Sequence, residues 1–181
     1  KIGILGTRGI PNQYGGFEEF AEKVSARWVA SGHEVIVYCE EQDDGEDVLD
    51  NGVRRVFVKT QERWLRGGYL FLFDFQCTLD ALRRGCDVCY HAGYASAVLG
   101  NMLLSRRLKH KLVYNMDGLE WARSKWPASI KSAIKIFERI AAKSDAVLVS
   151  DNTGIQDYLL KTYNVESHMI AYGAEKVVCT G

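Results

Sequence analysis

Short apolar runs alternate along the chain with longer segments whose apolar residues recur at helical spacing. The apolar runs predict seven strands, at residues 1–5, 34–39, 53–58, 87–90, 111–115, 146–150 and 168–171. The helical spacing predicts helices at residues 17–30, 69–82, 95–108, 130–142 and 154–163. The clearest helical pattern is the apolar face formed by Ile130, Ile134 and Phe137.

This order of elements indicates an α/β protein. The strand runs are apolar on both faces, which is typical of parallel strands covered by helices on both sides of a sheet. Right-handed crossovers between such strands produce a doubly wound arrangement. We therefore expect a Rossmann-like, doubly wound, mostly parallel seven-stranded sheet with helices on both faces.

Composition narrows the class of protein. The 181 residues are 47% hydrophobic and 25% charged, and neither a linker nor an internal repeat interrupts them, so we expect one globular domain. Basic and acidic residues balance at 23 each, which argues against bulk attraction to nucleic acid. The five cysteines form no disulfide framework and favour a reducing compartment, which makes a cytoplasmic location the expectation.

Two patterns resemble metal sites and are better explained otherwise. Residues 40–50 contain seven acidic side chains and no basic one, but they lack the ligand spacing of a calcium loop, so we expect a solvated acidic loop. Cys86 and Cys89 form a C-x-x-C pair with no second pair. If residues 87–90 form a strand, the two thiols point to opposite faces and are buried. The sequence therefore predicts no metal site.

In a sheet of this kind, ligands bind beyond the carboxyl ends of the strands, so residues that follow strands are the candidates for a site. Gly15 and Gly16 follow the first predicted strand at the start of a helix, and Arg8 belongs to the same loop. The helix dipole and open backbone N–H groups favour an anion there, although the two glycines are equally typical of a simple turn. The glycine spacing matches neither a dinucleotide loop nor a P-loop.

Two further candidates follow later strands. Asp117 comes after the fifth predicted strand, where a carboxylate would project over the sheet edge, but an Asp before a Gly is also a common turn residue. His91 directly follows the fourth predicted strand, and a histidine there is more often structural than catalytic. Neither residue is assigned by pattern alone.

Four motifs together resemble one family. They are Gly-Thr-Arg-Gly-Ile-Pro-Asn-Gln-Tyr-Gly-Gly-Phe-Glu-Glu-Phe at 6–20, Ser-Gly-His-Glu-Val at 31–35, Asp-Gly-Leu-Glu-Trp-Ala-Arg-Ser-Lys-Trp at 117–126 and Tyr-Gly-Ala at 172–174. The chain is similar through these motifs to the N-terminal domain of bacterial retaining glycosyltransferases of the GT-B type, in family 4 and its rhamnosyltransferase branch. The resemblance extends from residue 1 to about residue 175.

The resemblance implies two facing Rossmann-like domains with the active site between them. Residues 1–175 would be the N-terminal, acceptor-side domain, and residues 176–181 would begin the linker to a C-terminal, donor-binding domain. The enzyme would transfer rhamnose or another hexose from a nucleotide sugar to a saccharide or lipid-linked saccharide, with retention and without a metal cofactor. Such an activity belongs to polysaccharide biosynthesis, and the fragment alone would be inactive.

The resemblance also implies roles for individual residues. Gly15 and Gly16 would bind the donor's phosphate and sugar. Asp117 would be catalytic, although many relatives carry a histidine at this position, and a carboxylate would instead stabilise positive charge or accept a hydroxyl hydrogen bond. The remaining acceptor-site or cleft residues would be Arg8, Tyr14, Glu18, His91, Glu120 and Arg123.

Two other functions remain open at this point. The chain could be a stand-alone module that binds a saccharide or nucleotide without chemistry. It could also be an NAD-dependent oxidoreductase with Glu40, after the second strand, as the ribose ligand, although the glycine spacing disfavours that function.

A membrane partner is a further expectation from charge patterning. Lys131, Lys135, Arg139 and Lys143 recur every four residues and would line one strip of a helix. A second basic cluster comprises Arg106, Arg107, Lys109 and Lys111, and Trp121 and Trp126 lie near the first strip in sequence. Such strips suit the inner face of an anionic cell membrane, although most charged helix faces are simply solvated.

Overall fold

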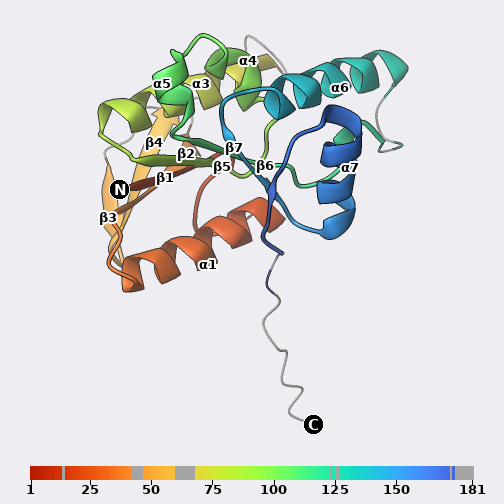
Figure 1. Ribbon diagram of the computed structural model, residues 1–181. Coiled ribbons are helices and arrows are strands. Elements are labelled where there is room, and N and C mark those ends of the chain that lie inside the picture. The colour runs from red at the N-terminus through yellow and green to blue at the C-terminus, as the bar shows by residue number, and fades with distance from the viewer. Residues whose placement is uncertain are drawn as a thin grey trace.

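The computed structural model describes residues 1–13, 15–41, 47–59, 68–122, 124, 127–171 and 173 (Figure 1). The strands are β1 (Ile2–Leu5), β2 (Val35–Glu41), β3 (Val48–Asp50), β4 (Val53–Lys59), β5 (Val88–His91), β6 (Leu112–Asn115), β7 (Val147–Ser150) and β8 (His168–Met169). The helices are α1 (Gly16–Ala30), α3 (Tyr69–Arg83), α4 (Ala97–Asn101), α5 (Arg106–Lys109), α6 (Ala128–Ala142) and α7 (Thr153–Tyr163), with a 3-10 turn, η2, at Glu120–Ala122.

The described strands form one sheet in the order β3-β4-β2-β1-β5-β6-β7-β8. Neighbouring strands are parallel throughout, except that β3 pairs antiparallel with β4. The strand order reverses direction at β1, which pairs with β2 on one side and β5 on the other. This reversal is the topological switch point, beside which doubly wound sheets bind their ligands.

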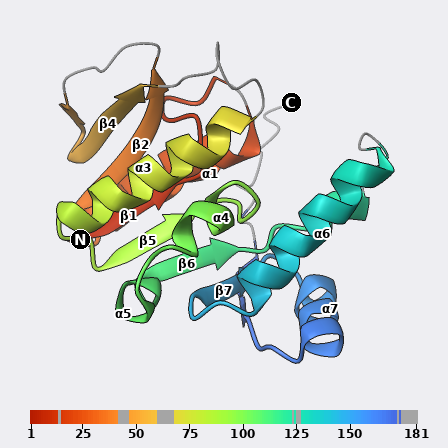
Figure 2. The same ribbon diagram turned by 90° about the horizontal axis from the view of Figure 1, so that it is seen from above.

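Helices cover both faces of the sheet. Helix α1 lies on one face, and α3, α4, α5 and α6 form a layer on the other (Figures 1 and 2). Along β2, Val35 and Val37 pack in the cluster that contains Ala21 of α1, whereas Ile36 and Tyr38 belong to the cluster that contains Phe73 of α3. The period of two along a strand therefore separates two cores, and the predicted doubly wound α/β fold is confirmed.

The sheet has one strand more than the seven predicted, because part of the acidic segment 40–50 is not a loop. Strand β2 continues to Glu41, and Val48–Asp50 forms β3. Asn51 and Gly52 turn the chain with φ values of 48° and 82°, the backbone that a two-residue hairpin requires. Residues 42–46 of the predicted loop lie outside the described residues.

The helix predicted at 95–108 is also wrong in part, because α4 ends at Asn101 and α5 begins at Arg106. A Cβ added to Gly100 would stand 2.5 Å from Cβ of Phe75, so the glycine allows α3 and α4 to pack closely. Ser105 then adopts an extended backbone before α5. Close packing here decides the course of the chain more than the apolar spacing does.

The cysteines within the described residues are buried free thiols, as predicted for the C-x-x-C pair. Strand β5 begins at Val88, so Cys86 precedes the strand rather than belonging to it. Burial raises the pKa of Cys89 to about 12, which leaves the thiol protonated and unreactive. Among the helices described, none combines the length and the apolar character needed to cross a membrane.

Candidate functional site

The loop after β1 approaches the end of β2 very closely. Gly9 has a φ of 112°, and an added Cβ would stand 2.6 Å from Sγ of Cys39 and 2.9 Å from its Cα. The Glu40 amide donates a hydrogen bond to the Arg8 carbonyl at 3.0 Å, which ties the loop to β2. The Arg8 side chain is half exposed, and its Nε lies 3.8 Å from a carboxylate oxygen of Glu40. Gly9 is therefore required for this loop to lie where it does.

Two carboxylates on α1 accept hydrogen bonds from backbone amides of the same loop. Glu18 is buried and accepts a hydrogen bond from the Arg8 amide at 2.9 Å. Glu22 accepts one from the Asn12 amide, also at 2.9 Å. The structure thus gives Glu18, expected in the cleft, a backbone partner in the loop, and its burial makes it a supporting residue rather than an exposed binding group.

The N-terminus of α1 has no side-chain cap. Gly15 is the N-cap residue and has no side chain to accept a hydrogen bond from the first turn. A Cβ added to Gly16 would meet no atom of the described residues within 4 Å, whereas one added to Gly15 would stand 3.7 Å from a carboxylate oxygen of Glu18. The dipole of this 15-residue helix favours an anion at its start, although Glu18 and Glu19 in the first turn are themselves acidic.

His91 is the last residue of β5, at the carboxyl end of the strand. Its side chain is fully buried, with Nε2 3.3 Å from Nδ2 of Asn101 and 3.5 Å from the Thr78 hydroxyl. Burial lowers the pKa of His91 to about 3, so the ring is neutral at physiological pH. The structure therefore places this expected cleft residue under α3 and α4, in the structural role that the sequence also allowed.

Tyr94 connects the loop after β5 to α6. It is buried, and its hydroxyl donates a hydrogen bond to a Glu138 carboxylate oxygen at 3.4 Å. Burial, the Glu138 charge and the nearby charges of Asp117 and Glu120 all raise the pKa of Tyr94. Asp117 is half-buried between β6 and η2, and Glu120 is half-buried within η2. Of these carboxylates, Glu138 is the one hydrogen-bonded to the Tyr94 hydroxyl.

The loop after β5 lies between the start of α1 and the end of β6, and so between the two groups of candidate residues. Phe17, in the first turn of α1, lies beside Gly93, where an added Cβ would stand 3.5 Å from the Phe17 ring. The Asn115 side-chain amide donates a hydrogen bond to the Ala92 carbonyl at 3.3 Å and so holds the end of β6 against the same loop. The start of α1 and Asp117 therefore flank one loop at the carboxyl edge of the sheet.

Glu138, a buried residue of α6, was not among the residues predicted from the sequence. Its side chain is 1% exposed and accepts hydrogen bonds from four donors on three other segments. The donors are the Tyr94 hydroxyl at 3.4 Å, the Trp121 indole at 3.0 Å, the Tyr158 hydroxyl at 2.7 Å and the Tyr163 hydroxyl at 2.6 Å. The sequence could have indicated this residue, because an acidic side chain on the apolar face of a predicted helix needs buried hydrogen-bond partners.

Of the expected site residues, Gly15, Gly16, Arg8, Asp117 and Glu120 lie at or beside the carboxyl edge, and Glu18 and His91 are buried supports. Tyr14 and Arg123 lie outside the described residues. The described residues contain no group of three His, Cys, Asp or Glu side chains that could hold a metal ion. The edge offers backbone donors at a helix start and carboxylates opposite, a combination that binds an anion beside hydroxyl groups.

Comparison with known families gives one match. Residues 97–175 match a family described as "Domain of unknown function (DUF1972)". This segment runs from α4 to the end of the described chain and includes Asp117, Glu120 and Glu138. Among curated proteins, none matches.

Solved structures match over nearly the whole chain. Sucrose-phosphate synthase from Thermosynechococcus elongatus superposes with a TM-score of 0.71 and 15% identity, over 96% of this chain and 48% of that chain. A shorter chain of the same enzyme gives a TM-score of 0.60 and 9% identity, over 96% of this chain and 89% of that one. The present chain therefore spans about half the length of the first of these proteins, and its fold matches one Rossmann-like half of the GT-B architecture.

Proposed function

We propose that the chain is the N-terminal, acceptor-side domain of a glycosyltransferase. The observation that carries this proposal is that the segments resembling glycosyltransferase motifs, which begin at Gly6 and Asp117, both follow parallel strands at the carboxyl edge of one sheet. The likeness of the fold to half of sucrose-phosphate synthase supports it. The active site would form when a second, donor-binding domain faces this edge.

The proposed reaction transfers a sugar from a nucleotide sugar to an acceptor hydroxyl. The bond between the anomeric carbon and the diphosphate oxygen breaks, and the anomeric carbon bonds to the acceptor oxygen. The hydroxyl proton leaves with the departing diphosphate or passes to solvent. The N–H groups at Gly15 and Gly16 would face the donor's phosphate or sugar, because the positive end of the α1 dipole lies there.

Asp117 would act on the sugar rather than on the phosphate. A carboxylate at this position would repel the diphosphate but stabilise positive charge that develops on the sugar ring, or accept a hydrogen bond from a sugar hydroxyl. Arg8, in the loop after β1, and Glu120, in η2, would contact the acceptor or the donor at the rim of the site. The buried supports Glu18 and Glu138 would keep the two loops in place.

The finer parts of the proposal rest on the motif resemblance alone. They are rhamnose or another hexose as the donor sugar, retention of configuration, a saccharide or lipid-linked saccharide as acceptor, a cytoplasmic location and no requirement for metal. Neither comparison identifies the sugar or favours the rhamnosyltransferase branch. The NAD-dependent alternative would need Glu40 as ribose ligand, and Glu40 lies beside Arg8 instead.

The test is a panel of nucleotide sugars supplied to the complete gene product with saccharide acceptors, in which released nucleoside diphosphate is measured. We expect release to require one donor and an acceptor, to persist in a chelator, and to be absent with the 181-residue chain alone because both walls of the cleft are needed. Failure of every donor, combined with tight binding of a saccharide, would favour the non-catalytic module. Saturable NAD binding would favour the oxidoreductase.

A further inference from the structure

Charge is distributed unevenly along this electrically neutral chain. Residues 88–143 contain ten basic and three acidic side chains, a net charge of +7, and the rest of the chain carries −7. Of the three acidic residues, Glu138 is buried, and Asp117 and Glu120 lie at the carboxyl edge of the sheet. The outward surfaces of α5 and α6 therefore carry the basic residues of this region, and α4 carries no charge.

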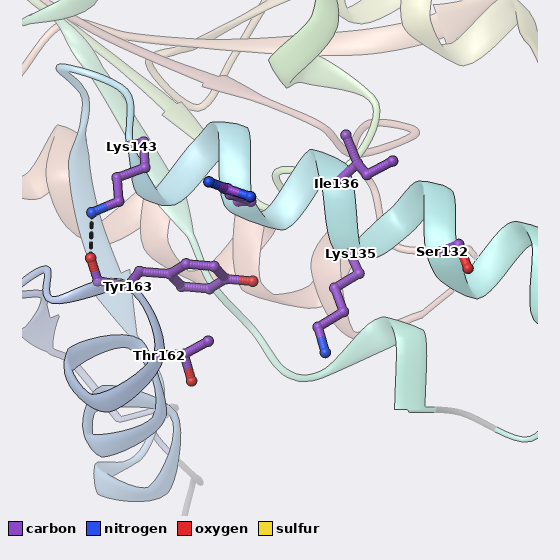
Figure 3. Close-up of a pocket in the computed structure, with 7 residues that line it drawn as sticks. Ser132, Lys135, Ile136, Lys143, Thr162 and Tyr163 are labelled. Atoms are coloured by element: carbon purple, nitrogen blue, oxygen red, sulfur yellow. Dashed lines mark hydrogen bonds between the residues drawn. The ribbon is translucent and has the colours of Figure 1, made fainter.

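A groove of about 620 Å³ lies between α6 and α7 within this positive region (Figure 3). Its lining comprises Ser132, Lys135, Ile136, Arg139, Lys143, Thr162 and Tyr163. Three of the four cations expected to form one strip thus line the groove, whereas Lys131 does not. The groove offers charged groups and hydroxyls beside an apolar wall.

The cations of the groove have no carboxylate partner among the described residues. The Lys143 ammonium donates a hydrogen bond to the Tyr163 carbonyl, and the Lys135 ammonium lies 4.5 Å from the centre of the Trp121 ring. Arg139 is exposed, between Lys135 and Lys143 along the helix. Unneutralised cations on one surface raise its electrostatic potential and attract an anionic partner.

Large apolar side chains stand exposed on the adjoining helix surface. Leu103 is 79% exposed and Met102 is 49% exposed at the end of α4, and Ile136 on α6 is 58% exposed. Helix α4 packs against α6 within the same helical layer (Figure 2), and Met102 lines a small cavity together with Ile140 of α6. Exposed aliphatic side chains beside cations are the composition of surfaces that enter the headgroup region of a bilayer.

Several residues that the sequence predicted for the membrane-binding surface have other contacts in the structure. Trp121, expected to contribute, donates its indole N–H to Glu138 and is covered by Lys135, so it supports the protein interior. Lys111 donates to the Cys86 carbonyl, and Arg106 pairs with Asp145 at 3.0 Å. Trp126 lies outside the described residues.

We propose that the groove between α6 and α7, together with the exposed side chains of α4 and α6, binds the surface of an anionic lipid bilayer. The cations contact lipid phosphates and carboxylates, while Leu103, Met102 and Ile136 enter the boundary with the acyl chains. A soluble phosphate would use the cations but leave these aliphatic side chains in water. The proposal does not depend on the proposed function.

The experiment is sedimentation of the 181-residue chain with vesicles of phosphatidylcholine, alone or mixed with phosphatidylserine, at low and moderate salt. We expect salt-sensitive binding to the mixed vesicles only. Each cation near such a surface contributes about fivefold in partitioning, so Arg139→Glu should weaken binding by about tenfold or more. Leu103→Glu should weaken it comparably, whereas Lys23→Glu, an identical charge change on α1 at the opposite face, should not.

Circular dichroism and thermal unfolding of each variant check that the fold is retained. Negligible binding to both kinds of vesicle, or equal binding to both, would overturn the proposal, as would an equal loss in Arg139→Glu and Lys23→Glu. Binding that is lost in Arg139→Glu but unaffected by Leu103→Glu, and that inorganic phosphate displaces, would identify a soluble-anion site instead. Loss in both surface variants with binding retained in Lys23→Glu would support the bilayer.

Discussion

The loops after β1 and β6 lie at the same edge of the sheet, and each is held by a buried glutamate in a different way. Glu18 accepts a hydrogen bond from a backbone amide of the first loop, to which it is close in sequence. Glu138 accepts hydrogen bonds from side chains on η2, on α7 and after β5. Glu18 therefore acts on a loop close to it in sequence, whereas Glu138 holds three segments around one carboxylate.

This difference predicts that stability depends more on Glu138 than on any residue of the first loop. Glu138→Ala would leave three tyrosine hydroxyls and an indole N–H without their acceptor, and we expect the free energy of unfolding to fall by about 3 kcal/mol or more. Glu138→Gln, which keeps one acceptor oxygen, should cost less. Urea denaturation measures both, and exposed Glu166→Ala is the control, expected to change little. A loss equal to that of the control would show that the four hydrogen bonds contribute little to stability.

In the first loop, the free energy of unfolding should depend on steric fit rather than on charge. Gly9→Ala combines an unfavourable φ with a contact against Cys39, and we expect it to cost about 2 kcal/mol or more in the free energy of unfolding. Gly16→Ala is the matched control, because nothing lies within 4 Å of its Cβ and alanine is favourable in a helix. Chemical denaturation of the two variants compares them. Equal stabilities would mean that the loop relaxes without cost.

Two buried titratable groups near α3 should give stability opposite dependences on pH. Burial raises the pKa of Asp74 from 3.8 to about 6, so its contribution is present below about pH 4 and lost as pH rises through 6. Burial lowers the pKa of His91 from 6.5 to about 3, so its contribution is present above about pH 6.5 and lost as pH falls toward 3. In the wild-type chain the two slopes partly cancel between pH 4 and 6.

Asp74→Asn should expose this cancellation. Relative to wild type, we expect the variant to gain about 2 kcal/mol in the free energy of unfolding between pH 4 and pH 8, because it has no charge to bury. Exposed Asp157→Asn is the control and should follow the wild-type pH dependence. Urea unfolding at several pH values gives the measurement. Parallel curves for wild type and Asp74→Asn would contradict the raised pKa.

The sequence was sufficient for the doubly wound fold because apolar strands and helical periodicity agree over most of the chain. It was insufficient for β3, because Val48 and Leu49 are exposed and form no long apolar run, although Asn51-Gly52 is a typical hairpin turn. The close packing of α4 against α3 at Gly100 depends on Phe75, a neighbour distant in sequence that no local pattern reveals.

The candidate site was predictable to a similar extent. Its location followed from the rule that ligands bind at carboxyl ends of parallel strands, which selected Gly15, Gly16 and Asp117. The burial of Glu18 and His91 depends on which face of an element points inward, and their sequence positions alone did not decide this. The donors to Glu138 come from segments up to 44 residues away in sequence, so only the fold brings them together.

Sugar transfer by the complete gene product with Asp117→Asn tests the central claim most directly. If Asp117 acts on the sugar at this edge, turnover should fall by about 10²-fold or more, because a neutral amide cannot supply the same electrostatic stabilisation. The free energy of unfolding should change by less than about 0.5 kcal/mol, and exposed Asp157→Asn should transfer sugar at the wild-type rate. Wild-type turnover in Asp117→Asn would contradict the account and leave Asp117 as a turn residue.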